Sequence, residues 1–274
     1  MNGLPRGRAG SIDRWLCRPR AELENLDAEL STRWGIELRS FEQEGWWQDL
    51  ATEMEEGAFE RFRSLHEQYD SAVSAGQDVT NLERDFYAAI AVDPLCGFVH
   101  SHRRAVILDA VALIEGLVSE ESTSGAVLDV GCHAGYLAAR LARHPELDMT
   151  GIDLCRPALE LGRGRCEELD RPVRFLCADA RAAKWPERFQ VVMAIDVLPD
   201  GAEDVAACLQ QFSRLLSDDG LLVVSSGLPV GETWGQGQGI GEVLSEARLG
   251  LLAVGCLGGC PGVGLEPLAQ AVMV

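Results

Sequence analysis

The stretch 126–136, with the sequence AVLDVGCHAGY, constrains the fold more than any other part of the chain. Its apolar start predicts a short buried strand, which turns through Gly131 and Gly135 and continues as a helix over 136–143. Glycines in such a turn let the backbone approach a ligand closely, and the start of a helix offers unpaired N–H groups. The pattern therefore predicts the opening unit of a nucleotide-binding α/β sheet.

The spacing of the two glycines separates two kinds of site. A dinucleotide site takes Gly-x-Gly-x-x-Gly after the strand, whereas three residues separate Gly131 from Gly135. With Asp129 before them, they form Asp-x-Gly-x-x-x-Gly, which resembles motif I of the class I S-adenosylmethionine-dependent methyltransferases. That family usually has a glycine where this chain has His133. His tolerates a positive φ, so we expect the turn to survive. For the glycines alone, an ordinary tight turn is the alternative.

Acidic residues recur at the ends of the next strands and strengthen the resemblance. Asp153 ends the second predicted strand, Asp179 follows the third and Asp196 follows the fourth. Since the carboxyl ends of parallel strands meet at one edge of a sheet, these acids should gather beside Asp129. The strands are predicted at 149–153, 173–177, 190–195 and 220–226, the last after a turn at 217–220.

The resemblance covers residues 105–274 and implies a fold and a cofactor. The fold is α/β, a doubly wound, seven-stranded, mostly parallel Rossmann-like sheet, completed by a helix at 240–250 and strands near 251–257 and 268–274. The cofactor is S-adenosylmethionine, with Asp129 orienting its ammonium group, Asp153 binding the ribose and Asp179 reading the adenine amino group. The other implied cofactor contacts are Gly131, Cys132, His133, Gly135, Leu154, Ala180 and Asp196.

Methyl transfer from a sulfonium requires few catalytic side chains, because the methyl group is already activated. The protein has to position the nucleophile and exclude water, no metal is required, and a general base helps only when the acceptor is protonated. Asp196 is the candidate to accept a proton or hold a substrate amine, and contact with the cofactor alone is the alternative. His100 and His102 are further candidates for a base, and Arg103 for the cofactor carboxylate. For that cluster, the solvated start of a helix over 101–118 is the alternative.

Residues 1–104 predict a helical N-terminal region, with the first 20 residues disordered. Apolar periodicity predicts helices over 21–44, 47–70 and 81–92, and a polar loop over 71–80. We expect these helices to form a lid over the carboxyl edge of the sheet and to shape the acceptor site. Packing among the helices accounts for most of their aromatic residues, and homodimerisation is the alternative role. The aromatic residues are Trp46, Trp47, Phe59, Phe62, Phe86, Tyr87 and Phe98.

The net charge and the cysteine content restrict the expected substrates and the expected cellular compartment. The formal net charge is −19, which repels phosphate backbones and makes nucleic acid an unfavourable substrate. Nine scattered cysteines, an odd number, indicate reduced thiols and a cytoplasmic protein. The apolar run 105–118 is too short to span a membrane. The glycine-rich segment 227–241 is predicted to be a loop that could line a substrate site.

The sequence thus predicts a methyltransferase that acts on a small, neutral or cationic organic acceptor. Two alternatives keep the same fold. One is a non-catalytic S-adenosylmethionine-binding regulator or partner subunit, and the other is an aminopropyltransferase. An oxidoreductase that uses NAD is disfavoured by the glycine spacing.

Overall fold

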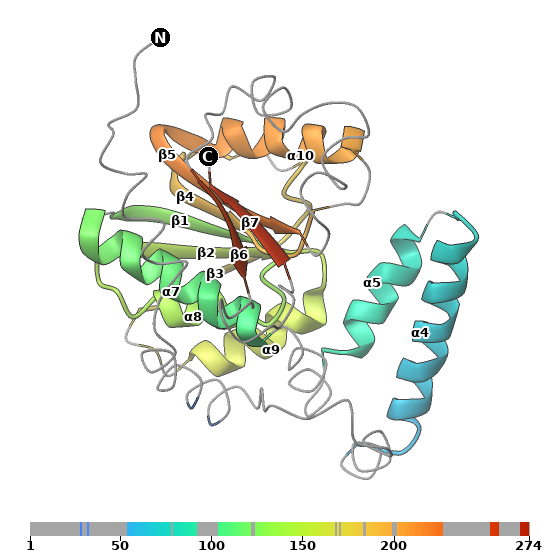
Figure 1. The fold of residues 1–274 in the computed structure, drawn as a ribbon. Coiled ribbons are helices and arrows are strands. Elements are labelled where there is room, and N and C mark those ends of the chain that lie inside the picture. Colours follow the sequence, from blue (N-terminus) through green and yellow to red (C-terminus); the bar gives the residue numbers. More distant parts are fainter. Residues whose placement is uncertain are drawn as a thin grey trace, which may run out of the picture.

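A computed structural model places an α/β domain beside a pair of helices (Figure 1). It describes residues 28, 32, 54–77, 79–91, 104–121, 124–167, 169, 171–182, 185–198, 202–226, 253–257 and 269–273. The helices are α4 (Ala58–Ser74), α5 (Thr80–Ala89), α7 (Arg104–Glu121), α8 (Tyr136–Leu141), α9 (Arg156–Cys166) and α10 (Ala202–Leu215). The strands are β1 (Gly125–Val130), β2 (Leu147–Asp153), β3 (Arg174–Cys177), β4 (Phe189–Ala194), β5 (Leu216–Ser226), β6 (Ala253–Leu257) and β7 (Ala269–Met273).

The strands form one sheet in the order β3-β2-β1-β4-β5-β7-β6. Strands β1 to β5 are parallel, and β7 runs antiparallel between β5 and β6. The order reverses between β1 and β4, which is the switch point where open α/β sheets bind ligands. The predicted mostly parallel, Rossmann-like α/β fold is confirmed.

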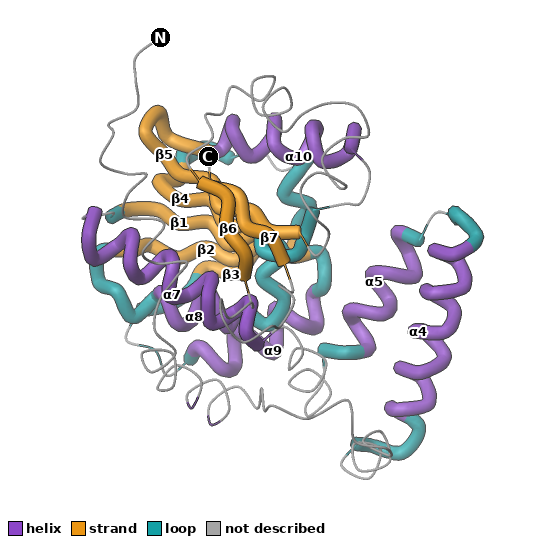
Figure 2. Tube along the Cα trace, viewed as in Figure 1, coloured by secondary structure: helices purple, strands orange, loops and turns teal. Residues whose placement is uncertain are grey.

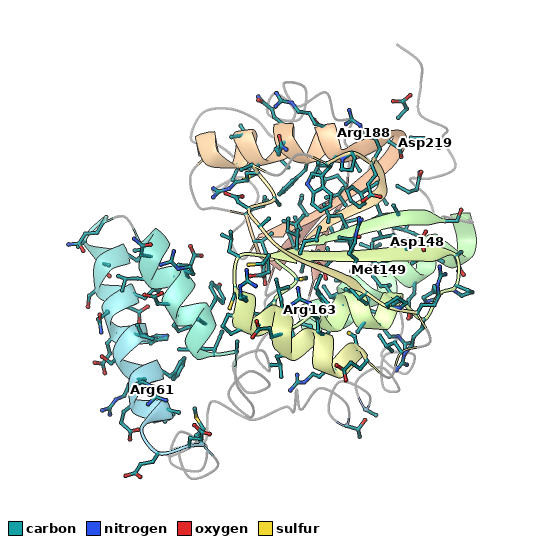
Figure 3. All side chains as sticks on the ribbon, turned by 180° about the vertical axis from the view of Figure 1, so that it is seen from behind. Arg61, Asp148, Met149, Arg163, Arg188 and Asp219 are labelled. Atoms are coloured by element: carbon teal, nitrogen blue, oxygen red, sulfur yellow. The ribbon has the colours of Figure 1, made fainter. Side chains whose placement is uncertain are left out.

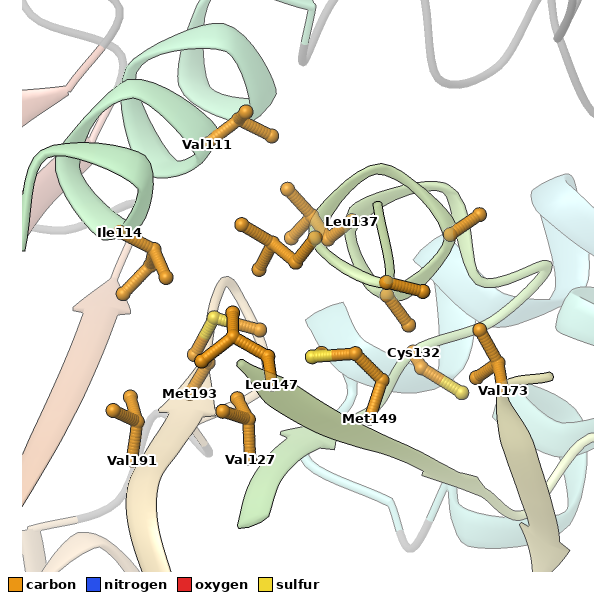
Figure 4. Packing of buried hydrophobic residues seen from close by; sticks show 14 of the residues in the cluster. Val111, Ile114, Val127, Cys132, Leu137, Leu147, Met149, Val173, Val191 and Met193 are labelled. Carbon is orange, nitrogen blue, oxygen red and sulfur yellow. The ribbon is translucent and has the colours of Figure 1, made fainter. Parts of the chain in front are cut away.

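Helices cover both faces of the sheet, as Figure 2 shows. Alternate residues of each strand point to opposite faces. Val127 of β1 and Met193 of β4 therefore join α7, α8 and α9 in one core cluster. Leu128 and Val192, one position away, join α10 in the other. Figure 4 shows the first cluster, in which Val111, Ile114 and Leu137 of the helices pack over the strands.

The prediction that a turn at 217–220 precedes the fifth strand is wrong, because these residues lie inside β5. Phe189 pairs with Leu216 and Val191 pairs with Leu221, so 217–220 form a bulge opposite Gln190. Two side chains hold the bulge. The Ser217 hydroxyl donates to the Phe189 carbonyl at 3.3 Å, and the Gln190 amide donates to the Asp219 carbonyl at 3.2 Å.

The N-terminal region contributes the hairpin of α4 and α5. The helix predicted over 47–70 begins later, after Gly57 in the left-handed conformation (φ 75°), and runs on to Ser74. The predicted loop 71–80 is thus partly helical, since the next left-handed glycine is Gly76 (φ 62°). The helix predicted over 81–92 corresponds to α5. In Figure 1 the hairpin stands beside the sheet, with α5 next to α9.

Several predicted segments lie outside the described residues. They are residues 1–20, most of the helix 21–44, residues Trp46, Trp47, Phe98, His100, His102 and Arg103, the loop 227–241 and the helix 240–250. Within the described ranges, no helix combines the length and the apolar character that crossing a bilayer requires.

Candidate functional site

The turn between β1 and α8 has the backbone that the sequence predicted. Gly131, His133 and Gly135 all adopt positive φ, at 69°, 46° and 76°. The Ile152 carbonyl of β2 accepts the N–H groups of Gly131 at 2.8 Å and Cys132 at 3.2 Å. The turn is therefore fastened to the neighbouring strand, and His133 tolerates the conformation as expected.

Packing, as well as φ, requires glycine at both motif positions. A Cβ on Gly131 would lie 2.2 Å from the Val197 side chain, and one on Gly135 would lie 2.5 Å from the Phe175 ring. Both distances are far below van der Waals contact, so the residues after β4 and in β3 close directly on the turn.

Asp153 is held at the carboxyl end of β2 by two backbone donors. Its Oδ2 accepts the N–H of His133 at 2.8 Å, and its Oδ1 accepts the N–H of Cys155 at 2.7 Å. An ionised carboxylate offers about four lone-pair sites, so acceptor capacity is left for two ligand hydroxyls. Figure 3 shows the opposite end of this strand, where Asp148 and Met149 lie away from the helical hairpin.

Asp129, near the end of β1, is a buried carboxyl group with only 2% of its surface exposed. Burial, followed by the negative charge of Asp153, raises its pKa to about 7, although a hydrogen bond from the Ala138 backbone lowers it. Its Oδ2 makes no hydrogen bond among the described residues. A buried carboxylate in this state is stabilised by a cation, so the site fits a ligand with an ammonium group.

The turn after β3 holds Asp179 and Ala180. Asp179 accepts the backbone N–H of Arg181 at 2.8 Å, and the Arg181 guanidinium donates to both of its carboxylate oxygens at 3.1 Å. Partial burial raises the pKa of Asp179, but these Arg181 interactions outweigh it and the pKa is lowered. Leu154, beside Asp153, keeps 53% of its surface exposed.

Asp196 follows β4 in the left-handed conformation, with φ 57°. Its N–H donates to the hydroxyl of Ser225, a buried residue of β5, at 2.9 Å. Because the next residue, Val197, contacts Gly131, this strand end joins the same edge of the sheet as the glycine turn. Ser225 was missed by the sequence analysis, since nothing in an apolar strand marks one serine as a support.

The structure thus brings the predicted residues of the sheet together along its carboxyl edge. The Cys132 thiol is buried, and burial raises its pKa well above the ordinary value. His100, His102 and Arg103 lie outside the described residues. The sequence analysis also missed the contact of Tyr87, on α5, with His133, whose rings lie 6.2 Å apart.

Comparisons with known proteins place the sheet domain among methyltransferases. Residues 127–220 match a family described as a methyltransferase domain. The ubiquinone biosynthesis O-methyltransferase of Proteus mirabilis is 34% identical over 87 residues, which are 30% of this chain and 35% of that protein. An uncharacterised methyltransferase of Mycobacterium tuberculosis is 36% identical over 99 residues, 36% of this chain and 48% of that protein. The chain therefore spans less than half the length of these curated relatives.

Two solved structures share the fold. Magnesium protoporphyrin IX methyltransferase from Synechocystis superposes with a TM-score of 0.53 at 18% identity, over 71% of this chain and 93% of that one. An S-adenosylmethionine-dependent methyltransferase from Clostridium acetobutylicum gives 0.50 at 13% identity, over 59% of this chain and 87% of that one.

The fold is an α/β domain in which the glycine turn and the acids meet at the carboxyl edge of a parallel sheet, the edge at which open α/β sheets bind ligands. The family match over residues 127–220 and the shared fold together support a class I S-adenosylmethionine-dependent methyltransferase domain in this chain. The resemblance seen in motif I is confirmed, and S-adenosylmethionine is the cofactor of this class.

Proposed function

We propose that the chain transfers a methyl group from S-adenosylmethionine to a small organic acceptor by in-line displacement. The observation that carries the proposal is the pair of acids at the glycine turn. Asp129 is buried with Oδ2 lacking a partner in the described part of the chain, whereas Asp153 is oriented by two backbone donors. The first suits an ammonium group and the second suits the two hydroxyls of a ribose.

The chain's own residues take these roles in the proposal. Asp129 holds the ammonium group, and the backbone of Gly131, Cys132, His133 and Gly135 lies along the methionine part. Asp153 accepts the ribose hydroxyls, and Leu154 offers its exposed side chain to the adenine. Asp179 and the Ala180 N–H face the adenine edge. When bound, the cofactor supplies a methyl group that its sulfonium has already activated.

Asp196 is proposed to face the acceptor. Its left-handed backbone and its hydrogen bond to Ser225 fix it at the end of β4. There it could hold an acceptor amine or take a proton from an acceptor hydroxyl. His100 and His102 stay candidates for a base, and Arg103 stays a candidate contact for the cofactor carboxylate.

We further propose that residues 1–104 cover the cofactor domain, residues 105–274, and shape the acceptor site. Contacts of α5 with the β1–α8 turn and with α9 support this arrangement. A small acceptor agrees with the names of the ubiquinone and magnesium protoporphyrin IX enzymes that the chain resembles. The net charge of −19 disfavours nucleic acid. Dimerisation through the same helices is the rival role.

Titration calorimetry on the full chain tests the function. We expect one equivalent of S-adenosylmethionine or S-adenosylhomocysteine to bind and NAD not to bind. Absence of S-adenosylmethionine binding, or equal binding of NAD, would overturn the proposal. Binding without S-adenosylhomocysteine release on any acceptor would favour a regulator. Turnover of decarboxylated S-adenosylmethionine would favour an aminopropyltransferase.

A further inference from the structure

Helix α5 rests on the two residues that hold Asp153. His133 and Cys155 donate the backbone N–H groups that fix its carboxylate. The ring of Tyr87 on α5 lies against the His133 ring, and Ala91, just after α5, packs in one cluster with Cys155. The position of α5 is therefore coupled to the orientation of the carboxylate that we assign to the ribose.

The coupling between α5 and Asp153 depends on the side chain of His133, which a glycine at this position would lack. Its side chain is only 6% exposed and fills the space between the turn and α5. Burial lowers the pKa of His133, while the nearby Asp153 charge and a hydrogen bond involving the Tyr87 backbone raise it. A glycine at this position would leave the turn without a side chain for α5 to contact. The departure from the usual motif thus coincides with the place where the helical hairpin docks.

Exposed apolar surface is concentrated at the same place. Among the described residues, the large hydrophobic side chains that stay exposed are Tyr87 at 40%, Leu154 at 53% and Val73 at 48%. Tyr87 lies against His133, whose N–H holds the Asp153 carboxylate, and Leu154 follows Asp153 in the chain. Two of the three are therefore linked to Asp153, one through His133 and one as its neighbour in the sequence. Small-molecule sites combine apolar walls with a few oriented polar groups.

We propose that Tyr87 is a cofactor-contacting residue, which places α5 in the wall around the adenosine half of S-adenosylmethionine, with His133 as its positioning residue. The inference rests on the proposed function and adds a residue from the N-terminal region to the cofactor site. A tyrosine ring offers a rigid, largely apolar face to a ribose or a base. The neighbouring Phe86 does not share this role, because its ring packs on Phe62 and Tyr69 inside the hairpin.

Calorimetry with S-adenosylhomocysteine on full-length variants tests the inference. Tyr87→Ala should weaken binding about tenfold, as loss of one stacked ring does. Tyr87→Phe keeps the ring and should bind within about twofold of wild type. Val73→Ala removes an equally exposed side chain on α4 and should change nothing. Equal affinity of Tyr87→Ala and wild type would overturn the inference.

Combining His133→Gly with Tyr87→Ala tests whether His133 positions the Tyr87 ring. His133→Gly restores the usual motif residue, and we expect it to weaken binding because α5 loses its contact. Adding Tyr87→Ala should then have little further effect, since the ring is already misplaced. Full additivity of the two changes would contradict the positioning role.

Hydrogen exchange of the wild type gives a readout that does not depend on any variant folding. Saturating S-adenosylhomocysteine should slow exchange in residues 80–89 as well as in the glycine turn. Protection of the turn without protection of 80–89 would overturn the inference and leave the proposed function intact. If the wild type does not bind S-adenosylhomocysteine at all, the proposed function itself fails.

Discussion

The sheet domain and the α4–α5 hairpin bury their hydrophobic residues in different ways. The sheet domain has two mostly aliphatic cores, one on each face, in which residues such as Leu128 and Val192 are fully buried. The hairpin has a small aromatic core in which Phe59 and Phe62 are buried and Phe86 is half-buried. A pair of helices gains little stability from so small a core, so its contact with the turn between β1 and α8 contributes to its stability.

The two regions also differ in how strongly packing restricts individual residues. In the sheet domain, Val197 leaves no room for a Cβ on Gly131, and Asp129 is buried. In the hairpin, the rings of Phe86 and Tyr87 contact each other, but Phe86 also packs on Tyr69 inside the hairpin, whereas Tyr87 also contacts His133. The sheet therefore builds the site, whereas the hairpin reaches it through single side chains.

The largest expected effect is on the free energy of unfolding, and it comes from the buried carboxylate of Asp129 in the sheet domain. Because the pKa of Asp129 rises from 3.8 to about 7 on folding, its ionisation opposes folding. This opposition is absent below about pH 4 and complete above about pH 7. At pH 8, Asp129→Asn should raise the ligand-free unfolding free energy by up to about 4 kcal/mol, measured by urea denaturation.

The same substitution should weaken cofactor binding, because the ammonium group loses its partner. At pH 4 wild type and Asp129→Asn should be close in stability, since the carboxyl group is then protonated in the folded state and partly protonated in the unfolded state. Wild-type affinity for S-adenosylmethionine should fall below pH 7. A stability difference that does not change between pH 4 and pH 8 would show that the buried charge is not its cause.

The next largest effect tests how tightly the sheet closes on the glycine turn. Gly131→Ala adds a Cβ that meets Val197 at 2.2 Å in a left-handed backbone. Strain and overpacking together should lower the unfolding free energy by about 3 kcal/mol. Gly164→Ala is the control, because no atom lies within 4 Å of its added Cβ in α9. It should stabilise by about 0.5–1 kcal/mol, and equal effects of the two variants would contradict the packing argument.

Measuring S-adenosylmethionine affinity compares the roles of two acids at opposite ends of β2. Asp153→Ala removes the proposed ribose acceptor and should weaken S-adenosylmethionine binding by roughly ten- to a hundredfold. Asp148→Ala removes an exposed acid at the other end of β2, where it pairs with Arg171 at 2.8 Å, and should leave affinity unchanged. The ribose assignment would be wrong if calorimetry gave wild-type affinity for a folded Asp153→Ala protein.

The smallest effect should be confined to the hairpin. Phe86→Ala removes a half-buried ring that packs on Phe62 and Tyr69. Hydrogen exchange should become faster in residues 58–89 by an amount equivalent to about 1–2 kcal/mol. Thermal unfolding of the sheet domain should change little, and a loss of stability across both regions would show that they fold as one unit.

Sequence reasoning predicted the sheet well because its signals are local. Short apolar runs that end in Asp129 or Asp153 mark strands and their carboxyl ends, and the tolerance of His133 for positive φ depends on one residue. The contact between Tyr87 and His133 depends on how two elements dock, which periodicity within α5 does not encode. The bulge in β5 was missed for the same reason, because Ser217 and Asp219 are held by Phe189 and Gln190 of the neighbouring strand.

The place of β7 in the sheet sets an order of assembly. Among the described strands, β6 pairs only with β7, yet β6 precedes β7 in the chain. During synthesis β6 therefore leaves the ribosome before the strand that anchors it exists. Until β7 inserts, the edge of β5 carries unpaired backbone groups that could pair with another nascent chain. Stalled chains that end between β6 and β7 should therefore aggregate more readily than the full chain.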